Sequence, residues 1–310
     1  MIVRPHTSIK HRAIGYYFKI CRDVMRKIRP LYYVDLYSGD GTCTCPDAPQ
    51  QAWEPPYINM LNECKENGLD LKCIFNDIEK KNIDSLDNKL KRYGNLVIKT
   101  YNADANKIYP ETLNLIPPSN WSIFCLDPCK HDQLNFSTIE GIANHKAPVP
   151  TSGEARRPEM IITFMVYSIL QTYKATKIKN ISETRKGGLL KSIDNCLGTD
   201  SWRKEVSKWE TSEIPETKMN YIFLKIFLTQ LARLGYYTVV FQVGQTLNKS
   251  IIYYLIFSTS MSRAYQIMSK NFEPCAKEVM QDEWLRQNFT FSKMARAKEK
   301  GFALLDEFLY

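Results

Sequence analysis

The chain has 310 residues, of which 44% are hydrophobic and 24% are charged, an ordinary composition for a globular protein. This length suits one large domain with additions, or two small domains. The longest apolar run, residues 160–170, is far shorter than the roughly 20 residues of a membrane-spanning helix, and the first residues do not resemble a signal peptide. Nine cysteines without regular spacing indicate free thiols in a reducing cytoplasm and exclude a disulfide framework.

The net charge of +9 is concentrated at the start of the chain. Residues 1–30 contain eight basic side chains and one acid, Asp23, in a segment whose pattern predicts a helix over residues 8–28. Such a basic N-terminal helix can bind phosphate backbones. The alternative is a solvated helix face packed beside the sheet. The predicted nucleic-acid contacts are Lys10, Arg12, Lys19, Arg22 and Arg26.

A buried strand is predicted over residues 31–36, and it leads into a tight turn that contains Gly39 and Gly41. Glycines here allow positive φ angles and a close approach of the backbone to a ligand. Asp35, at the end of the strand, can accept a hydrogen bond or meet a cation. The third glycine of the dinucleotide-binding fingerprint is missing. An acid before Gly-x-Gly is typical of class I methyltransferases, which bind the methionine part of S-adenosylmethionine (SAM) there; an ordinary turn after a strand is the alternative.

Four more strands follow, and most of them end in a polar or acidic residue. Each is a nearly continuous apolar run, as expected for parallel strands that are covered on both faces. A helix over residues 78–93 separates two of them, because apolar side chains recur there at spacings of three and four. Open α/β sheets bind ligands at the carboxyl ends of their strands, where these polar groups would meet. The predicted strands are residues 71–77, 96–101, 121–126 and 160–166.

The C-terminal half predicts a helix over residues 221–234 and then strands over residues 237–243 and 251–258. The seven residues between the two strands are too few for a parallel crossover, so the strands must be antiparallel neighbours if they share a sheet. We therefore predict an α/β, Rossmann-like class I methyltransferase fold with a mostly parallel, seven-stranded sheet. The predicted organisation is a basic helical extension (1–30), a methyltransferase-like domain (31–260) with a helical insertion at about 171–220, and a helical tail (261–310).

The order of these motifs resembles the three-Cys-motif partner proteins, a methyltransferase-like family. The resemblance covers about residues 8–260. It implies a SAM pocket and a protein partner related to radical-SAM enzymes. Its motifs are Lys10-His11, Tyr16-Tyr17, the run from Val34 to Gly41, Asp77, Asp104-Ala105-Asn106, Leu126-Asp127-Pro128, and the run from Tyr254 to Ser258.

Carried over residue by residue, the resemblance implies a role for each acid at a strand end. Asp35 would face the methionine and ribose side, Asp77 the ribose hydroxyls, and Asp104 the adenine amino group. Asp127 and Pro128 would face the substrate nucleophile. For each acid the alternative is a helix N-cap. The implied cofactor-binding set is completed by Tyr37, Gly39, Gly41 and Ala105.

The residues after Asp127-Pro128 depart from the family pattern, because Cys129-Lys130 replaces the usual aromatic residue. An aromatic ring at this turn stacks on the flipped base in methyltransferases that act on base amino groups. Lys130 would instead orient a polar or anionic acceptor. A Pro-Cys pair is also found in C5-cytosine methyltransferases, but their other motifs are missing, and Cys129 is expected to be a small buried residue. Cys43, Cys45 and Cys125 are expected to be unligated thiols, and no metal site is predicted.

The sequence therefore predicts a cytoplasmic SAM-dependent methyltransferase with Asp127, Pro128 and Lys130 at its reaction centre and an acceptor that could be nucleic acid. The alternative is a protein that keeps the fold, and with it the SAM pocket, but serves as a non-catalytic binding or scaffold partner.

Overall fold

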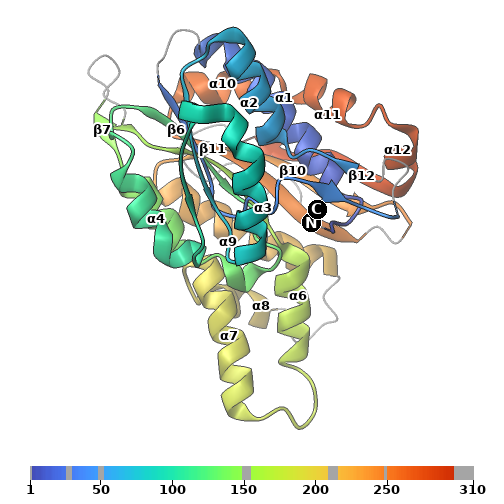
Figure 1. Ribbon diagram of the computed structural model, residues 1–310. Coiled ribbons are helices and arrows are strands. Elements are labelled where there is room, and N and C mark those ends of the chain that lie inside the picture. The colour runs from blue at the N-terminus through green and yellow to red at the C-terminus, as the bar shows by residue number, and fades with distance from the viewer. Residues whose placement is uncertain are drawn as a thin grey trace.

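The computed structural model describes residues 2–25, 30–47, 52–148, 155–208, 216–247 and 250–296. Its centre is an eight-stranded sheet with the order β12-β10-β11-β9-β6-β1-β4-β5 (Figure 1). The strands are β1 (Leu31–Asp35), β4 (Leu71–Asn76), β5 (Val97–Tyr101), β6 (Trp121–Leu126), β9 (Glu159–Phe164), β10 (Tyr237–Gln245), β11 (Ile251–Thr259) and β12 (Phe289–Arg296).

The sheet combines a parallel core with late antiparallel strands. β1 pairs in parallel with β4 and β6, and the parallel pairing continues to β5 on one side and β9 on the other. β11 lies antiparallel between β9 and β10. This arrangement confirms the predicted α/β methyltransferase-like fold.

Helices cover both faces of the sheet, because the strand residues alternate between two hydrophobic cores. Tyr33, Phe75 and Ile123 face one core, whereas Val34 and Phe124 face the other. The first core includes residues of α1 (Thr7–Met25), α2 (Pro56–Asn67), α3 (Lys80–Leu90), the 3-10 helix η1 (Lys91–Leu96), α11 (Phe272–Val279) and α12 (Glu283–Asn288). The second includes residues of α4 (Ala105–Asn114), α5 (Phe136–Asn144), α6 (Val166–Ala175), α7 (Glu183–Leu197), α8 (Trp202–Ser207) and α9 (Glu216–Arg233).

The N-terminal helix α1 packs into the first core through one apolar face, which contains Ile9, Ala13, Tyr17 and Cys21. Tyr17 also donates a hydrogen bond to the buried carboxylate of Glu159, which accepts a second bond from Thr259 at 3.0 Å. The helix is therefore an integral part of the domain, as the packed-helix alternative predicted. Its expected last residues, 26–28, lie outside the described part of the chain.

The C-terminal segment differs from the predicted helical tail. After α10 (Ser262–Lys270), α11 and α12, residues 289–296 form β12, an eighth strand that pairs antiparallel with β10. Phe289 and Phe291 are both buried at alternate positions, a period-two pattern that indicates a strand. The prediction of seven strands and an all-helical tail was wrong in this respect, and residues 297–310 lie outside the described chain.

Shorter elements complete the domain. Cys43–Thr44 (β2) pairs with Ala52–Trp53 (β3), and Ala147–Pro148 (β7) pairs with Ala155–Arg156 (β8). The predicted helical insertion corresponds to α6, α7 and α8, although α6 already begins at Val166. Among the helices that the structure describes, none has the length and hydropathy needed to cross a membrane.

Candidate functional site

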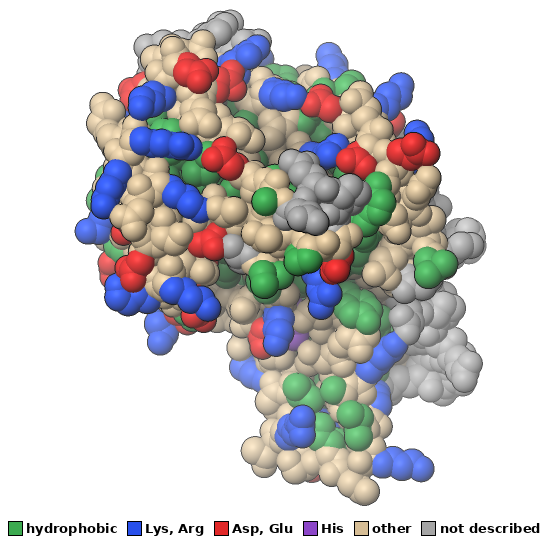
Figure 2. Space-filling model, turned by 45° about the vertical axis from the view of Figure 1, so that its right-hand side comes forward, with side chains coloured by type: hydrophobic (Ala, Val, Ile, Leu, Met, Phe, Trp, Pro, Cys, Tyr) green, Lys and Arg blue, Asp and Glu red, His purple; other side chains and the backbone are tan. Residues whose placement is uncertain are grey.

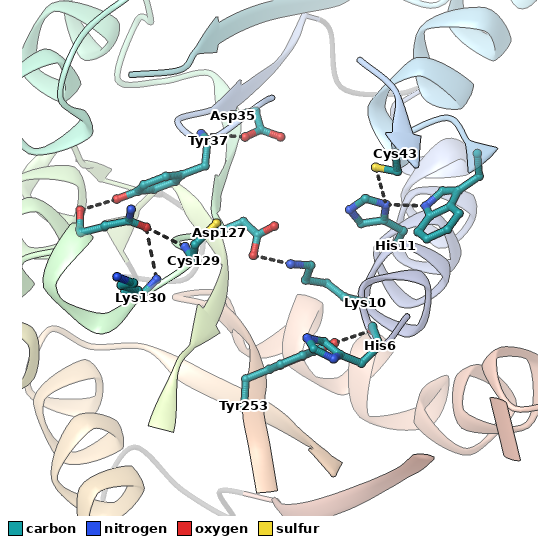
Figure 3. A network of polar contacts seen from close by, with 12 residues as sticks. His6, Lys10, His11, Asp35, Tyr37, Cys43, Asp127, Cys129, Lys130 and Tyr253 are labelled. Carbon is teal, nitrogen blue, oxygen red and sulfur yellow. Dashed lines mark hydrogen bonds and ion pairs between the residues drawn. The ribbon is translucent and has the colours of Figure 1, made fainter. Parts of the chain in front are cut away.

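Three carboxylates meet at the carboxyl edge of the parallel strands. Asp35 is the last residue of β1 and is paired in register with Phe75 of β4 and Cys125 of β6. Asp77 and Asp127 each lie two residues beyond these partners, so the sheet brings all three acids to one edge. Figure 3 shows Asp35, Asp127, Lys10 and His11 directed toward the same region from different elements.

The glycine turn after β1 has the predicted conformation. Gly39 and Gly41 have φ angles of 65° and 74°, in the region that favours glycine. A Cβ atom on Gly41 would lie 3.1 Å from side-chain atoms of Leu86 and Lys89, both on α3. Lys89 also donates a hydrogen bond to the Asp40 carbonyl at 2.8 Å. The turn is thus held against α3, and its backbone is kept free of side chains at Gly39 and Gly41.

The Asp77 carboxylate connects this turn to the start of α3. It accepts hydrogen bonds from the Gly39 backbone at 2.9 Å, the Glu79 backbone at 2.8 Å and the Asn82 side chain at 3.0 Å. Glu79, and not Asp77, occupies the N-cap position of α3. Asp77 therefore fixes the glycine turn relative to α3, and its contact with the ribose hydroxyls stays a prediction.

Asp104 is the N-cap of α4, the alternative that the sequence left open. Its Oδ1 atom accepts hydrogen bonds from the Asn106 backbone at 2.9 Å and from the Asn106 side chain at 3.2 Å. Ala105, the first residue of α4, is buried. The predicted adenine contact of Asp104 would have to be made in addition to this cap.

Asp35 is a buried acid with a raised pKa. It accepts hydrogen bonds from the Tyr37 backbone and the Tyr33 hydroxyl, both at 3.0 Å. Burial raises the pKa of Asp35 to about 7, and the nearby Asp127 and Asp77 carboxylates add to the rise, against the lowering effect of the two hydrogen bonds. A cation bound beside Asp35 would favour its ionised form.

Asp127 forms an ion pair with Lys10 of α1 (Figure 3). The Lys10 Nζ atom lies 2.6 Å from Asp127 Oδ1 and 5.7 Å from the centre of the Tyr253 ring, and the Lys10 side chain is only 9% exposed. Burial alone would raise the pKa of Asp127, but the Lys10 ammonium and hydrogen bonds from Lys10 and Thr163 hold it below its usual value. Asp127 is therefore ionised at neutral pH.

This ion pair corrects the prediction that Lys10 contacts phosphate. Lys10 cannot contact phosphate from an exposed helix face, because it is buried at the sheet edge. Lys130, the cation predicted beside Asp127, is exposed, and its backbone N–H donates to the Gln133 side chain at 3.2 Å. Lys10 supplies the positive charge that pairs with Asp127, and the predicted role of Lys130 in orienting the acceptor stays a prediction.

His11 contributes a neutral hydrogen-bond donor next to this pair. The Trp53 indole N–H donates to His11 Nδ1 at 3.0 Å, and an indole nitrogen can only donate. The proton of the neutral ring is therefore on Nε2. Burial, with a smaller contribution from Lys10, lowers the pKa of His11 to about 3. Cys43, whose sulfur lies 3.8 Å from His11 Nδ1, is a buried thiol with a pKa raised by burial to about 12.

The turn after β6 is held by Gln133, a residue that sequence reasoning missed. Its side-chain oxygen accepts from the Cys129 backbone at 2.7 Å, and its carbonyl accepts from the Tyr37 hydroxyl at 2.7 Å and from Asn106 at 2.9 Å. The strand ends of β1, β5 and β6 are thereby connected. No sequence spacing could reveal this, because Gln133 acts through its turn conformation.

Cys129 is exposed, so the prediction of a buried thiol was wrong. Partial desolvation of the thiol, together with the Asp127 carboxylate, raises the pKa of Cys129. A raised pKa disfavours the thiolate on which C5-cytosine chemistry depends. Among the described residues, no three His, Cys, Asp or Glu side chains are grouped closely enough to hold a metal ion.

The other predicted phosphate contacts on α1 are paired with acids of the same chain. Arg12 lies 3.0 Å from Asp282, Lys19 pairs with Glu278 at 2.5 Å, and Arg22 lies 3.1 Å from Glu63. Arg26 lies outside the described residues. The positive charge of this helix is thus largely balanced within the chain.

Comparison with solved structures supports the fold. The protein LPL1258 from Legionella pneumophila, assigned to the family model DUF519, superimposes with a TM-score of 0.52 at 10% identity, over 94% of this chain and 96% of that one. The plantazolicin methyltransferase BamL, solved with a substrate analogue and S-adenosylhomocysteine (SAH), gives a TM-score of 0.40 at 11% identity, over 93% and 84% of the two chains. No family model and no curated protein matches the sequence. What this chain shares with LPL1258 is the fold alone, and the resemblance to three-Cys-motif partner proteins remains a hypothesis.

Proposed function

We propose that the protein is a SAM-dependent methyltransferase that binds its cofactor across the carboxyl ends of β1, β4 and β5. The observation that carries this proposal is the convergence of Asp35, Asp77 and Asp127 beside a glycine turn with positive φ angles. The residues at this edge fit the chemical groups of SAM. SAM carries a sulfonium, an ammonium and a carboxylate, and this edge offers several acids for the cations and one buried ammonium, that of Lys10.

Each residue has a role that follows from its environment. Asp35, with a pKa near 7, would become ionised beside the cofactor ammonium. Asp77 keeps accepting capacity on Oδ2, which receives one bond, from Gly39, so a ribose hydroxyl can donate to it. Lys10 and the His11 Nε2–H would face the cofactor carboxylate from α1.

The bound cofactor supplies an electrophilic methyl group for direct in-line transfer. Asp127 would accept a hydrogen bond from the attacking amine or hydroxyl of the acceptor and align it, and alignment of the two reactants supplies most of the rate. Lys10 keeps Asp127 ionised for this role. Pro128 is buried and restricts the backbone of the turn by its fixed φ.

Calorimetry with SAM and SAH tests the binding half of the proposal. Asp77→Ala is expected to weaken SAM binding by about 1.5–3 kcal/mol, the scale of hydrogen bonds to a charged group. Asp84→Ala, which removes an exposed acid of the adjoining helix α3 that pairs with Lys80, is the matched control and should leave the affinity unchanged. Equal affinities for the wild type and Asp77→Ala would exclude this pocket.

Transfer of a labelled methyl group from SAM to cellular RNA, DNA and protein fractions tests the catalytic half. Asp127→Asn should abolish turnover while SAM binding persists, because an interaction made in the transition state need not affect cofactor affinity. If the wild type binds SAM but labels no fraction, the non-catalytic alternative, with a protein partner in place of an acceptor, replaces the enzyme.

A further inference from the structure

The helices α6 and α7 form a hairpin, here called the arm (residues 166–197), that extends away from the rest of the domain (Figure 1). α6 begins two residues after the end of β9, at the same sheet edge as Asp127. The arm therefore rises beside the candidate reaction centre, where a large acceptor would have to approach.

The arm is strongly basic. Between residues 174 and 191 it has six Lys and Arg side chains and a single acid, Glu183. Lys179, Arg185 and Lys191 are all exposed, and blue side chains lie along the projecting lobe in Figure 2. One of the six cations, Lys186, pairs with Glu183 at 3.7 Å. In α1, Arg12, Lys19 and Arg22 all face acids of the same chain.

The surface between these charges is open to a close approach. Gly187 and Gly188 of α7 are exposed, and a Cβ atom on either would meet no other atom within 4 Å. The Tyr167 side chain at the base of the arm is 43% exposed, and that of Ile178 near the tip is 63% exposed. α7 has 15 residues and so a length of about 22 Å. One nucleic-acid strand carries a charge every 3.4 Å or so, and it could place several phosphates along this length.

His131 joins the arm to the turn that contains Asp127. The buried His131 ring contacts Ser168 of α6 through Nδ1 at 2.9 Å and Ser192 of α7 through Nε2 at 3.1 Å. The Ser192 hydroxyl donates to the Leu189 carbonyl at 2.8 Å, so Nε2–H donates to Ser192, and Nδ1 accepts from Ser168. His131, which follows Asp127 by four residues in the chain, thus holds both helices of the arm in a fixed position.

We propose that the arm is the docking surface for the phosphate backbone of a nucleic acid that carries the methyl acceptor. Its positive charge, on the turn between the helices and along α7, complements a polyanion, and its base adjoins the reaction centre. The assignment of this nucleic acid as the acceptor rests on the proposed function; the binding itself does not.

The test compares two triple charge reversals in the full-length protein. The first is Lys179→Glu, Arg185→Glu and Lys191→Glu on the arm. The matched control is Arg263→Glu, Lys270→Glu and Lys277→Glu on α10 and α11, exposed cations at the opposite end of the molecule. The net charge changes equally in both. The probe is a fluorescent, mixed-sequence single-stranded RNA of about 20 nucleotides, with duplex DNA in parallel, measured by anisotropy between low and physiological salt.

The arm variant should bind the RNA or DNA at least about tenfold more weakly, with a salt slope reduced by about 2, because each phosphate contact to a single strand contributes about 0.7 to the slope. The control should bind like the wild type. Equal losses in both variants, an unchanged salt slope, or binding only to anionic vesicles would overturn the proposal. Calorimetry with SAM on the same arm variant separates the docking hypothesis from the cofactor hypothesis. If the arm variant loses nucleic-acid binding but still binds SAM, the cofactor pocket and the fold are intact and the loss is specific to the arm.

Discussion

The ion pair between Lys10 and Asp127 should be strongly coupled, and a double-mutant cycle measures this. Lys10→Met removes the ammonium but keeps most of the aliphatic side chain. The two charged atoms lie 2.6 Å apart, with 9% of the Lys10 side chain and 21% of the Asp127 side chain exposed. Removing one partner of a buried pair costs about 3–5 kcal/mol because the other charge remains uncompensated. Since Asp127 is partly exposed and also bonded to Thr163, we expect about 3 kcal/mol.

The double variant Lys10→Met/Asp127→Asn removes both charges together. Its loss of unfolding free energy should be smaller than the sum of the single losses, with a coupling of about 2 kcal/mol, within the range for residues in direct contact. Urea unfolding followed by circular dichroism gives all four free energies. Additive losses, with a coupling below about 0.5 kcal/mol, would refute the reasoning.

The pH dependence of the unfolding free energy of the same variants tests whether the pKa of Asp127 is lowered in the folded protein. The pKa of Asp127 is lowered in the folded protein, so its contribution to stability is present above its ordinary pKa and is lost as the pH falls through the folded value. The difference in unfolding free energy between the wild type and Lys10→Met should therefore become smaller at acidic pH. A difference that stays constant down to the acid limit would contradict the ion pair.

Three further predictions concern other buried groups of the domain. SAM affinity should rise as the pH increases through about 7, because Asp35 ionises there; in Asp35→Asn calorimetry should show no such rise, and a flat profile in the wild type would argue against a cofactor ammonium at Asp35. Burial raises the pKa of Glu159, so its contribution to stability is lost as the pH rises through the folded value. Glu159→Gln, which keeps one of the two accepting oxygens and cannot ionise, should become more stable relative to the wild type as the pH increases, and thermal unfolding that shows the opposite trend would refute this. Gly41→Val should cost about 1–3 kcal/mol of stability and weaken SAM binding, because φ is +74° and the new Cβ would press on α3; an unchanged melting temperature would show that the turn relaxes freely.

The parallel sheet could be predicted because each of its strands is a nearly continuous apolar run in the sequence. Apolar runs such as residues 121–126 are long enough to be buried on both faces, and the short connection before Ile251 forces β10 and β11 to be antiparallel. The acids Asp35, Asp77 and Asp127 could be assigned to one edge for the same reason, since the ends of parallel strands coincide. β12 was missed although Phe289 and Phe291 alternate, because the surrounding segment has a helical composition.

The partners of α1 could not be predicted from the sequence. A basic residue in a helix has the same local pattern whether it faces solvent or a carboxylate elsewhere in the fold. Lys10 is separated from Asp127 by 117 positions, and Arg12 from Asp282 by 270. Only the way the helix docks across the sheet turns Lys10 from a surface cation into a site residue. The same holds for His11, whose tautomer depends on Trp53.

The position of α1 also has a consequence for the order in which the protein folds. The groups that fix this helix are Asp127, Glu159 and Asp282, and they lie 117, 142 and 270 positions after their partners in α1. Contacts so distant in sequence carry a large loop-closure entropy and form slowly. The nascent chain must therefore expose the apolar face of α1, with Ile9, Ala13 and Phe18, until most of the sheet exists. We therefore expect α1 to dock in a late folding step, after the sheet against which it packs has formed.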